Sequence, residues 1–584
     1  MEKIVDQYIR ENNLANFPLH RLQFAYQQGK STETAIHSLV TVIEKAIESK
    51  QIALCAFIDI SGAFDNTSYE AIYNALYLKE VPEPITRWII FMLKSRTIST
   101  ELGGTIKSIK ATRGCPQGGV LSPLLWTLVI DELLHKLNNL GFHTQGYADD
   151  LVVYVLGWHE ETISDRMQQA LTIINKWCTE KGLSINPSKT TLVPFTRRRN
   201  INLKCPTLNG TTLQLSTEAN YLGVSLDKTL TWNSHIERVT SKATRAFFAC
   251  TRLFGKTWGL NPRMTFWTFT TVVKPIVTYA SLAWWPKVKQ RKAVSELNKL
   301  RRLICVGITG AMKTCPTDAL GVLLNIPPLP ILIEREARSS ALRLKGISEL
   351  KSGDMKGHLK ILEDFLHSPI LHRDDILSPK PILFRNFQVI INERTDWRTN
   401  SITFKPGSQL WFTDGSKLEN GRTGAGINGP KFKKSIPMGF YPTIFQAEIH
   451  AIEICVRECL RRKMRGTHIY ILSDSQAALK ALLSTTITSK LVNDCLNLLN
   501  TLGNLNIVTL GWIPGHEGHE GNEMADDLAK QGANMQLTGP EPFCGLTKGH
   551  INEFLRKWEE RKLAAHWLNC AGQRQVDLTL TGTV

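Results

Sequence analysis

The adjacent aspartates Asp149 and Asp150 are the residues that most clearly indicate chemistry. An aspartate pair usually belongs to a solvated turn. Here the pair precedes an apolar run, residues 151–154, that is typical of a buried strand. Carboxylates at the end of a buried strand are suitable ligands for a hard cation such as Mg²⁺. A metal site of this kind needs a third carboxylate on a neighbouring strand.

Asp59 meets this requirement. It follows residues 52–58, a short continuous apolar run that predicts another buried strand. Acids that are packed together without a cation repel one another, which is a cost without a function. The three aspartates therefore favour a metal site over unrelated turns.

The elements around these acids predict an α+β layer with an antiparallel sheet. Ser122 is the expected cap of one helix, with Pro123 as its first helical residue. The acid pair is expected in a hairpin. The other predicted elements are helices at 32–49, 68–94, 121–140 and 160–182, the second interrupted near Pro82 and Pro84, and a short strand at 183–185.

The net charge indicates a polyanionic partner, nucleic acid before membrane. The chain has 584 residues and a formal net charge of +18. Residues 233–302 contain fourteen Lys or Arg and two acids, Glu237 and Glu296, which gives a net charge of +12. Four tryptophans are interleaved with these cations. The segment is either a phosphate-tracking surface, which the charge density favours, or a solvated helical face over an aromatic core.

Several other classes of protein are not indicated. No apolar run reaches the roughly 18 residues of a spanning helix, and the first residues have no apolar signal core. The twelve cysteines are scattered without a CxxC pair, so neither a disulfide framework nor a zinc site is expected. The sequence predicts a reduced, intracellular protein.

Five motifs in order resemble the reverse transcriptases of non-LTR (LINE-type) retrotransposons, in particular jockey-like and I-factor-like elements. The resemblance covers nearly the whole chain. Any one motif is weak, but five in this order are highly specific. The motifs are AFIDISGAFD at 56–65, RGCPQGGVLSP at 113–123, YADD at 147–150, GLSINPSKT at 182–190 and YLGV at 221–224.

The resemblance implies a polymerase metal site for two Mg²⁺ ions, with Mn²⁺ as an alternative. Asp59 and Asp149 would be ligands, Asp150 would lie beside them, and the main-chain carbonyl of Ile60 could add an oxygen. The reaction is the in-line attack of a 3′-hydroxyl on the α-phosphate of a dNTP.

The resemblance also implies residues that contact the substrates, each with a plain structural alternative. Phe64 would block a 2′-hydroxyl, or is a core phenylalanine. Gln117 and Gly118 would approach the nascent base pair, or belong to an ordinary loop. Lys189 could protonate the departing pyrophosphate, or is an exposed lysine. Leu222 and Gly223 would seat the primer terminus, or form a hairpin turn.

A second set of motifs resembles ribonuclease H over its full length. The implied metal ligands are Asp414, Glu448, Asp474 and Asp526, again for two ions that activate water against an RNA phosphodiester. His516 would transfer a proton or aid product release. As alternatives, the acids are turn formers or helix charges and the histidine an exposed loop residue. The motifs are LWFTDGS at 410–416, FQAEIHA at 445–451, IYILSDS at 469–475, GWIPGH at 511–516 and GNEMAD at 521–526.

Together these features predict a multidomain α+β protein with a right-hand polymerase palm, a helical thumb and a ribonuclease H-like α/β domain. The chain begins just before QFAYQQGKST at 23–32, which resembles the last fingers element, so a fragment or truncated copy is expected. The expected boundaries are a palm with a fingers remnant at 1–232, a basic helical thumb at 233–370, a Pro-rich linker at 371–406, ribonuclease H at 407–537 and a tail at 538–584.

The expected function is RNA-directed DNA synthesis by target-primed reverse transcription, with ribonuclease H removal of the RNA strand. The expected partners are an RNA template, a DNA primer, RNA–DNA hybrid and dNTP, with no membrane. The expected location is the nucleus, with a cytoplasmic ribonucleoprotein stage. The alternative is a truncated, polymerase-dead chain that binds nucleic acid and retains at most ribonuclease H activity.

Overall fold

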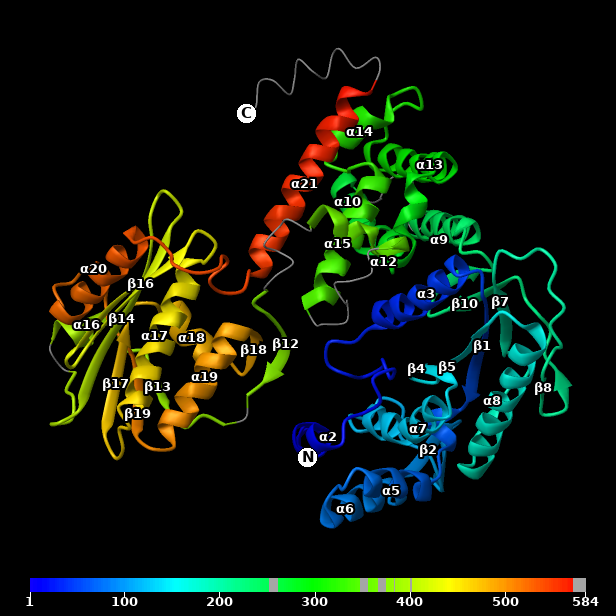
Figure 1. Cartoon of the computed structure of the whole chain (residues 1–584), viewed down its shortest axis with the longest axis horizontal. Helices are drawn as coiled ribbons and strands as arrows, with labels where there is room; N and C mark the ends of the chain where they lie inside the picture. The colour runs from blue at the N-terminus through cyan, green and yellow to red at the C-terminus, as the bar shows by residue number, and fades with distance from the viewer. Residues whose placement is uncertain (252–260, 347–355, 366–373, 383, 400–401, 571–584) are drawn as a thin grey trace. The chain divides into compact units, whose positions relative to one another are not determined.

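The computed structural model describes two compact units (Figure 1). The described residues are 1–251, 261–346, 356–365, 374–382, 384–399 and 402–570. The first unit comprises Met1–Ser340, Asp354–Ile361 and Lys562–Val584, and the second comprises Ala341–Gly353 and Leu362–Arg561. No helix among the described residues is long and apolar enough to cross a membrane.

An antiparallel sheet organises the first unit, as the sequence predicted. Its path is β4 (His143–Tyr147), β5 (Asp150–Gly157), β1 (Ile52–Ser61) and β6 (Ser184–Ile185). A further strand, β7 (Thr191–Phe195), pairs with β1. Every pairing between these strands is antiparallel.

The central strand β1 is apolar along its length because both faces of the sheet are covered. Alternate residues of a strand point to opposite faces. Leu54, Ala56 and Ile58 therefore pack into one core, with helices that follow in the chain, whereas Cys55 and Phe57 pack into a second core with residues of the segments 36–47 and 236–333. A continuous apolar run is typical of such two-sided burial.

The helices of the palm largely follow the sequence prediction. One difference concerns Ser122, which is the first residue of its helix and not the cap; Leu121 is the N-cap and Pro123 the second helical residue. The Ser122 hydroxyl instead donates to the carbonyl of Pro116, 2.7 Å away. The palm helices are α1 (Glu2–Tyr8), η1 (Ile9–Asn13), α2 (Leu14–Asn16), α3 (Thr32–Glu48), α4 (Ala63–Asn66), α5 (Tyr69–Leu78), α6 (Glu83–Lys94), α7 (Ser122–Asn139) and α8 (Glu160–Glu180).

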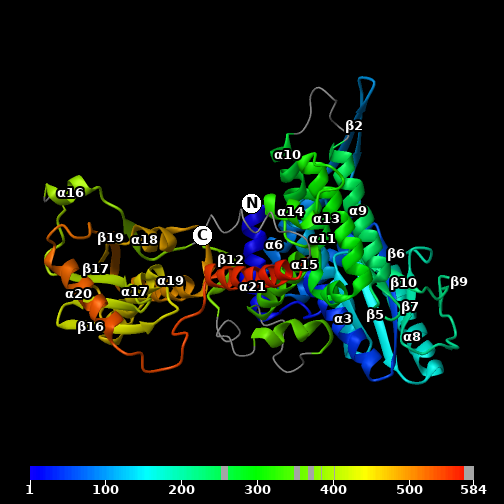
Figure 2. The same cartoon turned by 90° about the horizontal axis from the view of Figure 1, so that it is seen from above.

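Three two-stranded hairpins complete this part of the first unit. The hairpin of β2 (Thr97–Leu102) and β3 (Thr105–Lys110) is solvent-exposed and projects from the unit (Figure 2). The sequence did not predict it, because its residues lack the apolar alternation of a half-buried strand. The other two are β8 (Thr207–Leu208) with β9 (Thr211–Thr212), and β10 (Glu218–Tyr221) with β11 (Val224–Asp227).

The segment predicted as a basic thumb is helical where it is described. Helices α9, α11, α13 and α14 lie side by side in Figure 2. They share the second core with one face of the palm sheet. The elements are α9 (Asn233–Thr251), α10 (Pro262–Thr268), η2 (Phe269–Val273), α11 (Lys274–Thr278), α12 (Ser281–Trp284), η3 (Trp285–Lys289), α13 (Arg291–Thr309), α14 (Thr317–Leu323), α15 (Leu329–Gly346) and η4 (Gly357–Phe365).

The second unit contains a mixed six-stranded sheet in the order β13-β19-β17-β14-β15-β16. Helices cover both faces, with α17 on one face and α20 on the other (Figure 1). A Cβ built on Gly415 would meet α17, and a Cβ built on Gly426 would meet α20. The elements are β14 (Gln409–Lys417), β15 (Thr423–Gly429), β16 (Phe432–Gly439), α17 (Ile444–Arg461), β17 (His468–Ser473), α18 (Gln476–Leu483), β18 (Thr486–Ser489), α19 (Lys490–Gly503), β19 (Ile507–Trp512) and α20 (Glu520–Asn534).

The segment expected as a linker, residues 371–406, contributes to this second unit. Its strand β13 (Gln388–Ile390) pairs in parallel with β19, and β12 (Ile376–Pro381) pairs with β18. The buried Asp375 accepts hydrogen bonds from Ser489 and from the backbone of Leu491, which fixes the start of α19. A short helix, α16 (Arg394–Arg398), buries Trp397. The described part of 371–406 is therefore folded structure.

The region expected as a C-terminal tail also contains regular structure. Helix α21 (Lys548–Leu568) occupies much of residues 538–584. The residues beyond Cys570 lie outside the described part of the chain. The sequence prediction missed this helix, although its buried residues Ile551, Leu555 and Trp558 follow helical spacing.

Candidate active sites

The palm sheet brings Asp59 and Asp150 opposite each other. They are partners in the register of the antiparallel strands β1 and β5. Directly beside them, the amide of Ile60 donates to the carbonyl of Asp149, 3.5 Å away. Asp59 lies two residues after Phe57, and Asp150 two residues before Val152, so each aspartate shares a sheet face with that neighbour. This is the face that packs against the helices of the predicted thumb. The three aspartates predicted from sequence therefore come together at the ends of two paired strands.

The turn that carries Asp149 is held in an unusual backbone conformation. Tyr147 pairs with Asp150, which leaves Ala148 and Asp149 as a two-residue loop. Ala148 has φ +54°, a region that L-residues other than glycine seldom occupy. Trp126 of helix α7 donates its indole N–H to the Ala148 carbonyl at 2.8 Å. Such conformations persist where the surroundings fix them, and they cluster at functional sites.

The acids of the palm repel one another electrostatically. Burial, and then the charges of Asp149 and Asp59, raise the pKa of Asp150 to about 6. The Lys189 ammonium lies 3.1 Å from Asp59 Oδ2, so the predicted lysine does reach the site. Among the described residues, the three palm aspartates do not form a group whose oxygens all lie within 4.8 Å. A divalent cation that draws these oxygens together would relieve the repulsion, so the donors fit the predicted metal.

Phe64 lies in an aromatic group beside the acids. It is half-buried and packs against Trp126 at a centroid distance of 6.0 Å and edge-on against Tyr26 at 6.5 Å. Burial, and then the charge of Asp149, raise the pKa of the Tyr26 phenol. Tyr26 was missed as a site residue, and only its position within the fingers-like motif pointed to it. The ring of Phe64 is thus held in place near Asp149 and is not enclosed in the core.

Gln117 and Gly118 lie on a loop that is tied to the first acid motif. The Gln117 amide donates to Asp65 Oδ2 at 2.9 Å. Gly118 has φ +87°, and a Cβ built on it would meet nothing within 4 Å. The glycine therefore faces open space in a conformation that a side chain would strain. This leaves the backbone accessible to a ligand.

Leu222 and Gly223 form the tip of the β10–β11 hairpin. Their φ values are +47° and +82°, as a type I′ turn requires. The hydroxyl of Tyr279, at the end of α11, donates to the Leu222 carbonyl at 2.9 Å. A groove with a volume of about 420 Å³ adjoins the turn and contains the cations Arg238 and Lys242. The turn alternative is therefore correct as structure, and the adjoining basic groove suits a nucleic-acid backbone.

The basic thumb segment separates into exposed and buried parts. Trp284 and Trp285 are buried, so they belong to the core and do not offer stacking surfaces; Trp267 is exposed. Trp258 lies outside the described residues. Lys287 and Arg301 are also buried. Among the described residues of this segment, the cations that remain exposed are Arg238, Lys242, Arg245, Arg263, Lys289, Arg291, Lys292 and Lys299.

The second unit gathers three acids much more tightly. Asp414 lies on β14, Glu448 in the second turn of α17, and Asp474 directly after β17. One carboxylate oxygen from each lies within 4.8 Å of the others. Asp414 and Glu448 are only 6% and 4% exposed. A buried group of three carboxylates is costly unless a cation or protons compensate the charge.

The protonation of these acids reflects that cost. Burial, and then the charge of Asp474, raise the pKa of Asp414, and burial with the charge of Asp414 raises that of Glu448 well above its usual range. Burial also raises the pKa of Asp474, against a hydrogen bond from Asn522. The backbone N–H of Gly415 donates to Asp414 at 2.8 Å. Oxygen donors of this density fit Mg²⁺ or Mn²⁺.

Asp526 and His516 lie at the edge of this group. Asp526 Oδ2 is 2.7 Å from the ammonium of Lys530, one helical turn further along α20. His516 is 80% exposed at φ +56°, and its Nδ1 lies 3.9 Å from Asp526 Oδ2. Asp526 is therefore the fourth acid but is not part of the tight trio. Lys530 and Asn522 were not predicted; only the i,i+4 spacing of Lys530 from Asp526 could have indicated the first.

Comparison with known families agrees with these two sites. Residues 1–226 match the family model of reverse transcriptase (RNA-dependent DNA polymerase), and residues 406–534 match that of RNase H. The chain thus carries a reverse transcriptase domain and a ribonuclease H domain. Among solved structures, RNase H1 from the halophilic archaeon Halobacterium salinarum aligns over 22% of this chain and 98% of its own, with 20% identity and a TM-score of 0.19.

The curated relatives to which the chain is similar include proteins of the R1 and jockey retrotransposable elements. A putative 115 kDa protein in the type-1 retrotransposable element R1DM of Drosophila melanogaster is 28% identical over 53% of this chain and 30% of its own length. The RNA-directed DNA polymerase from mobile element jockey of Drosophila funebris is 28% identical over 40% and 26%. The chain spans about a third of the length of the first of these relatives.

Proposed function

We propose that this chain copies RNA into DNA at the palm site and cleaves the RNA strand of hybrids at the second site. Two separate groups of acids in one chain carry the proposal, and each group contains carboxyl groups whose pKa is raised. Perturbed carboxylates grouped in this way are frequent at catalytic sites. Target-primed reverse transcription is the process in which both activities would operate.

At the palm, the protein residues would position the primer, the template and the incoming dNTP. Asp59, Asp149 and Asp150, with the carbonyl of Ile60, would hold two Mg²⁺ or Mn²⁺ ions. When bound, these ions would lower the pKa of the attacking 3′-hydroxyl and neutralise charge on the phosphate. Lys189 would donate a proton to the departing pyrophosphate.

The remaining palm residues would act through shape. Phe64 would lie under the incoming sugar and exclude a 2′-hydroxyl. Gln117 and Gly118 would approach the nascent base pair, where the open face of the glycine admits a base. Leu222 and Gly223 would support the primer terminus beside the basic groove.

In the second unit, the chemistry would be hydrolysis of an RNA phosphodiester. Asp414, Glu448, Asp474 and Asp526 would hold the ions that supply an activated water. His516 is exposed and next to Asp526, so it can take up or release a proton at the solvent side. Lys530 would compete with a cation for Asp526 and release it when the site is occupied.

A second candidate function has a specific observation in its favour. The palm aspartates are less closely grouped than the acids of the second unit, and Lys189 is paired with Asp59. A chain that binds hybrid and cleaves its RNA strand, but does not extend a primer, would fit this difference.

One experiment separates the two candidates. The purified chain is given Mg²⁺ with a primed RNA template and, separately, a labelled RNA–DNA hybrid. Asp149→Ala should abolish extension alone and Asp474→Ala cleavage alone. The exposed acids Asp165 and Asp527 supply matched controls, since alanine at either should leave both activities intact. Cleavage without any extension by the unaltered chain would support the second candidate, and binding without either activity would contradict both.

We further propose that the chain acts in the nucleus after a cytoplasmic ribonucleoprotein stage. Copying at a nicked chromosomal target requires access to DNA, and the net charge of +18 suits an RNA-bound intermediate. Imaging of a fluorescent fusion, with and without the element RNA, tests this location.

A further inference from the structure

Outside the two acid sites, three different metal-binding side chains meet in the first unit. Asp318 lies in the first turn of α14, His566 in the last turn of α21, and Cys570 two residues beyond that helix. One ligand atom from each lies within 4.8 Å of the others. This group could not be predicted from the sequence, because Asp318 and His566 are 248 residues apart.

The distances within the group fit a tetrahedral zinc site. Cys570 Sγ lies 3.6 Å from His566 Nε2 and 3.5 Å from Asp318 Oδ2, and His566 Nε2 lies 3.1 Å from Asp318 Oδ1. Zinc bonds of about 2.3 Å to sulfur and about 2.0–2.2 Å to nitrogen and oxygen give tetrahedral edges of about 3.6 Å with sulfur and about 3.4 Å without it. The sulfur–nitrogen distance matches such an edge. The two distances to Asp318 end on different carboxylate oxygens, so a small rotation of the carboxylate would be needed to present one oxygen to both partners.

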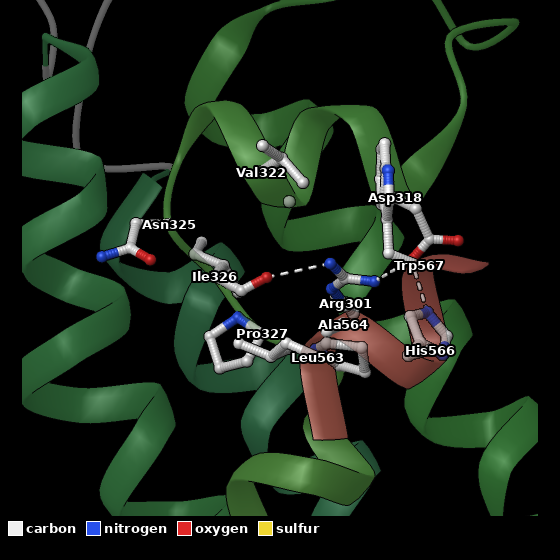
Figure 3. Close-up of a pocket in the computed structure, with 12 residues that line it drawn as sticks. Arg301, Asp318, Val322, Asn325, Ile326, Pro327, Leu563, Ala564, His566 and Trp567 are labelled. Atoms are coloured by element: carbon white, nitrogen blue, oxygen red, sulfur yellow. Dashed lines mark hydrogen bonds and ion pairs between the residues drawn. The ribbon is translucent and has the colours of Figure 1, made fainter. Parts of the chain in front are cut away.

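Local structure brings these ligands to one point. His566 and Cys570 have the i,i+4 spacing that places two side chains on one helix face. Arg301, only 3% exposed, holds Asp318 Oδ1 through Nη1 at 2.5 Å and donates through Nη2 to the Ile326 carbonyl at 2.9 Å (Figure 3). The carboxylate is therefore oriented by a buried partner, as ligands in metal sites usually are.

A glycine and a pocket adjoin the three side chains. A Cβ on Gly321 would lie 1.8 Å from Arg301 Nη2, so a side chain at this position would have to displace the guanidinium that pairs with Asp318. A pocket of about 310 Å³ adjoins the group and is lined by Asp318 and His566 with the apolar Leu563, Trp567 and others (Figure 3). The pocket offers a path for an ion and a place for water at a fourth coordination position.

The donor set selects the metal. One sulfur, one imidazole nitrogen and one carboxylate oxygen suit Zn²⁺, whereas Mg²⁺ and Ca²⁺ prefer oxygen alone. A thiolate and a carboxylate balance the two charges of Zn²⁺, so the occupied site itself carries no net charge.

We propose that Asp318, His566 and Cys570 bind a Zn²⁺ ion that fastens the end of α21 to α14. Three protein ligands hold the ion, and water completes its coordination. The alternative is an ion-pair cluster of Arg301, Asp318 and His566 without a metal, in which the Cys570 thiol only donates a hydrogen bond to Asp318.

Metal content and spectroscopy test this site in the full chain. Stripped protein is equilibrated with Zn²⁺, or with Co²⁺ as a spectroscopic probe, in excess Mg²⁺ so that the carboxylate sites are filled. We expect one Zn²⁺ per chain and a thiolate-to-cobalt charge-transfer band. Cys570→Ser and His566→Gln should each weaken Zn²⁺ binding more than about tenfold. Loss of a residue that only supports a ligand already costs about tenfold or more, so loss of a ligand should cost at least as much. Cys315→Ser, at a half-buried cysteine outside the group, should not.

Hydrogen exchange gives a second readout that does not depend on the variants. Zn²⁺ should slow amide exchange in the last turns of α21 in the unaltered chain and in Cys315→Ser, but not in Cys570→Ser. Absence of tight Zn²⁺ binding by the unaltered chain would overturn the proposal. So would Zn²⁺ binding that neither Cys570→Ser nor His566→Gln weakens, because the ion would then be held elsewhere.

Discussion

At the scale of single residues, the acids of the two sites differ in how the fold holds them. Asp414 and Glu448 are buried on a strand and a helix that pack together, so their oxygens meet. Asp149 is carried by a two-residue turn, and Asp59 faces Lys189. The palm site therefore has more freedom to rearrange when substrates bind. This difference is the physical basis for expecting cleavage to be the more robust of the two activities.

Replacement of Phe64 tests the proposed exclusion of ribonucleotides. Because its ring is held between Trp126 and Tyr26, Phe64→Val should open space without unfolding the palm. We expect incorporation of ribonucleotides relative to deoxyribonucleotides to rise by at least about tenfold, as the removal of a steric contact worth about 1.4 kcal/mol would produce. Single-nucleotide extension with each substrate measures the ratio.

The exposed Phe91 supplies the matched control, since Phe91→Val removes the same volume on the surface of α6. Its sugar preference should equal that of the unaltered chain. An unchanged preference in Phe64→Val would assign Phe64 to packing alone.

The site residues that could be predicted from sequence are those fixed by local pattern. Asp59, Asp149 and Asp474 each adjoin a run of strand-forming residues, so their position at a strand end followed from the sequence alone. Tyr26 and Asn522 could not be found in this way. Their roles depend on contacts between distant segments, and no local periodicity encodes these contacts.

At the scale of elements, backbone proximity fixes the position of Asp526. Gly424 and Gly426 of β15 let helix α20 approach the sheet at backbone distance. A Cβ on Gly426 would lie 2.1 Å from the carbonyl oxygen of Ala525, which is the residue directly before Asp526. The strand glycines thus determine where the fourth acid stands relative to the trio.

Gly426→Ala should therefore impair cleavage although it touches no acid. The added methyl must displace α20, and overpacking of this kind costs about 1–3 kcal/mol. We expect hybrid cleavage to fall at least tenfold (about 1.4 kcal/mol) while primer extension is retained. Steady-state cleavage and extension assays on the same preparation measure both.

Gly549→Ala is the control, because its Cβ would meet only the Thr547 hydroxyl at 3.4 Å. Equal cleavage by Gly426→Ala and Gly549→Ala would contradict the proposed role of helix placement.

Elements were predictable where capping and apolar pattern agree, and not where partners come from afar. Helix α3 begins as expected, with Ser31 in a capping box, and β1 is a buried strand as its composition required. Strand β13 has three residues and exists through its pairing with β19. Its Pro-rich, polar surroundings look like a linker in the sequence, yet Asp375 and Trp397 in the same stretch are buried.

At the scale of the molecule, the two units have separate cores and separate titrating groups. The first unit contains buried histidines whose pKa values lie below the usual range. Burial, and then the charge of His358, lower the pKa of His37 to about 3, and burial lowers that of His235 to about 4. Both must be neutral in the folded unit near neutral pH.

The first unit should therefore lose stability as the pH falls below about 6.5. The unfolded chain binds a proton at each such histidine near its ordinary pKa of about 6.5, and the folded unit does not, so protons favour unfolding. For His37 alone, the loss between about pH 6.5 and about pH 5 amounts to about 2 kcal/mol. Urea unfolding across this range measures the slope.

His37→Gln should lower the number of protons taken up on unfolding by about one and so flatten that slope, whatever its effect on stability at neutral pH. His159→Gln, at an exposed histidine, should leave the slope as it is. Equal slopes in the two variants would show that His37 does not contribute.

The hydrogen bond from Tyr279 to Leu222 has a mechanical consequence for repeated nucleotide addition. After each addition the duplex must advance by one step, and a thumb that relaxes its hold lets the template escape. Because Tyr279 joins the thumb to the tip of the β10–β11 hairpin, the two would move as one clamp. Tyr279→Phe would uncouple them. Single additions would then proceed normally, while the number of nucleotides added each time the chain binds a template would decrease.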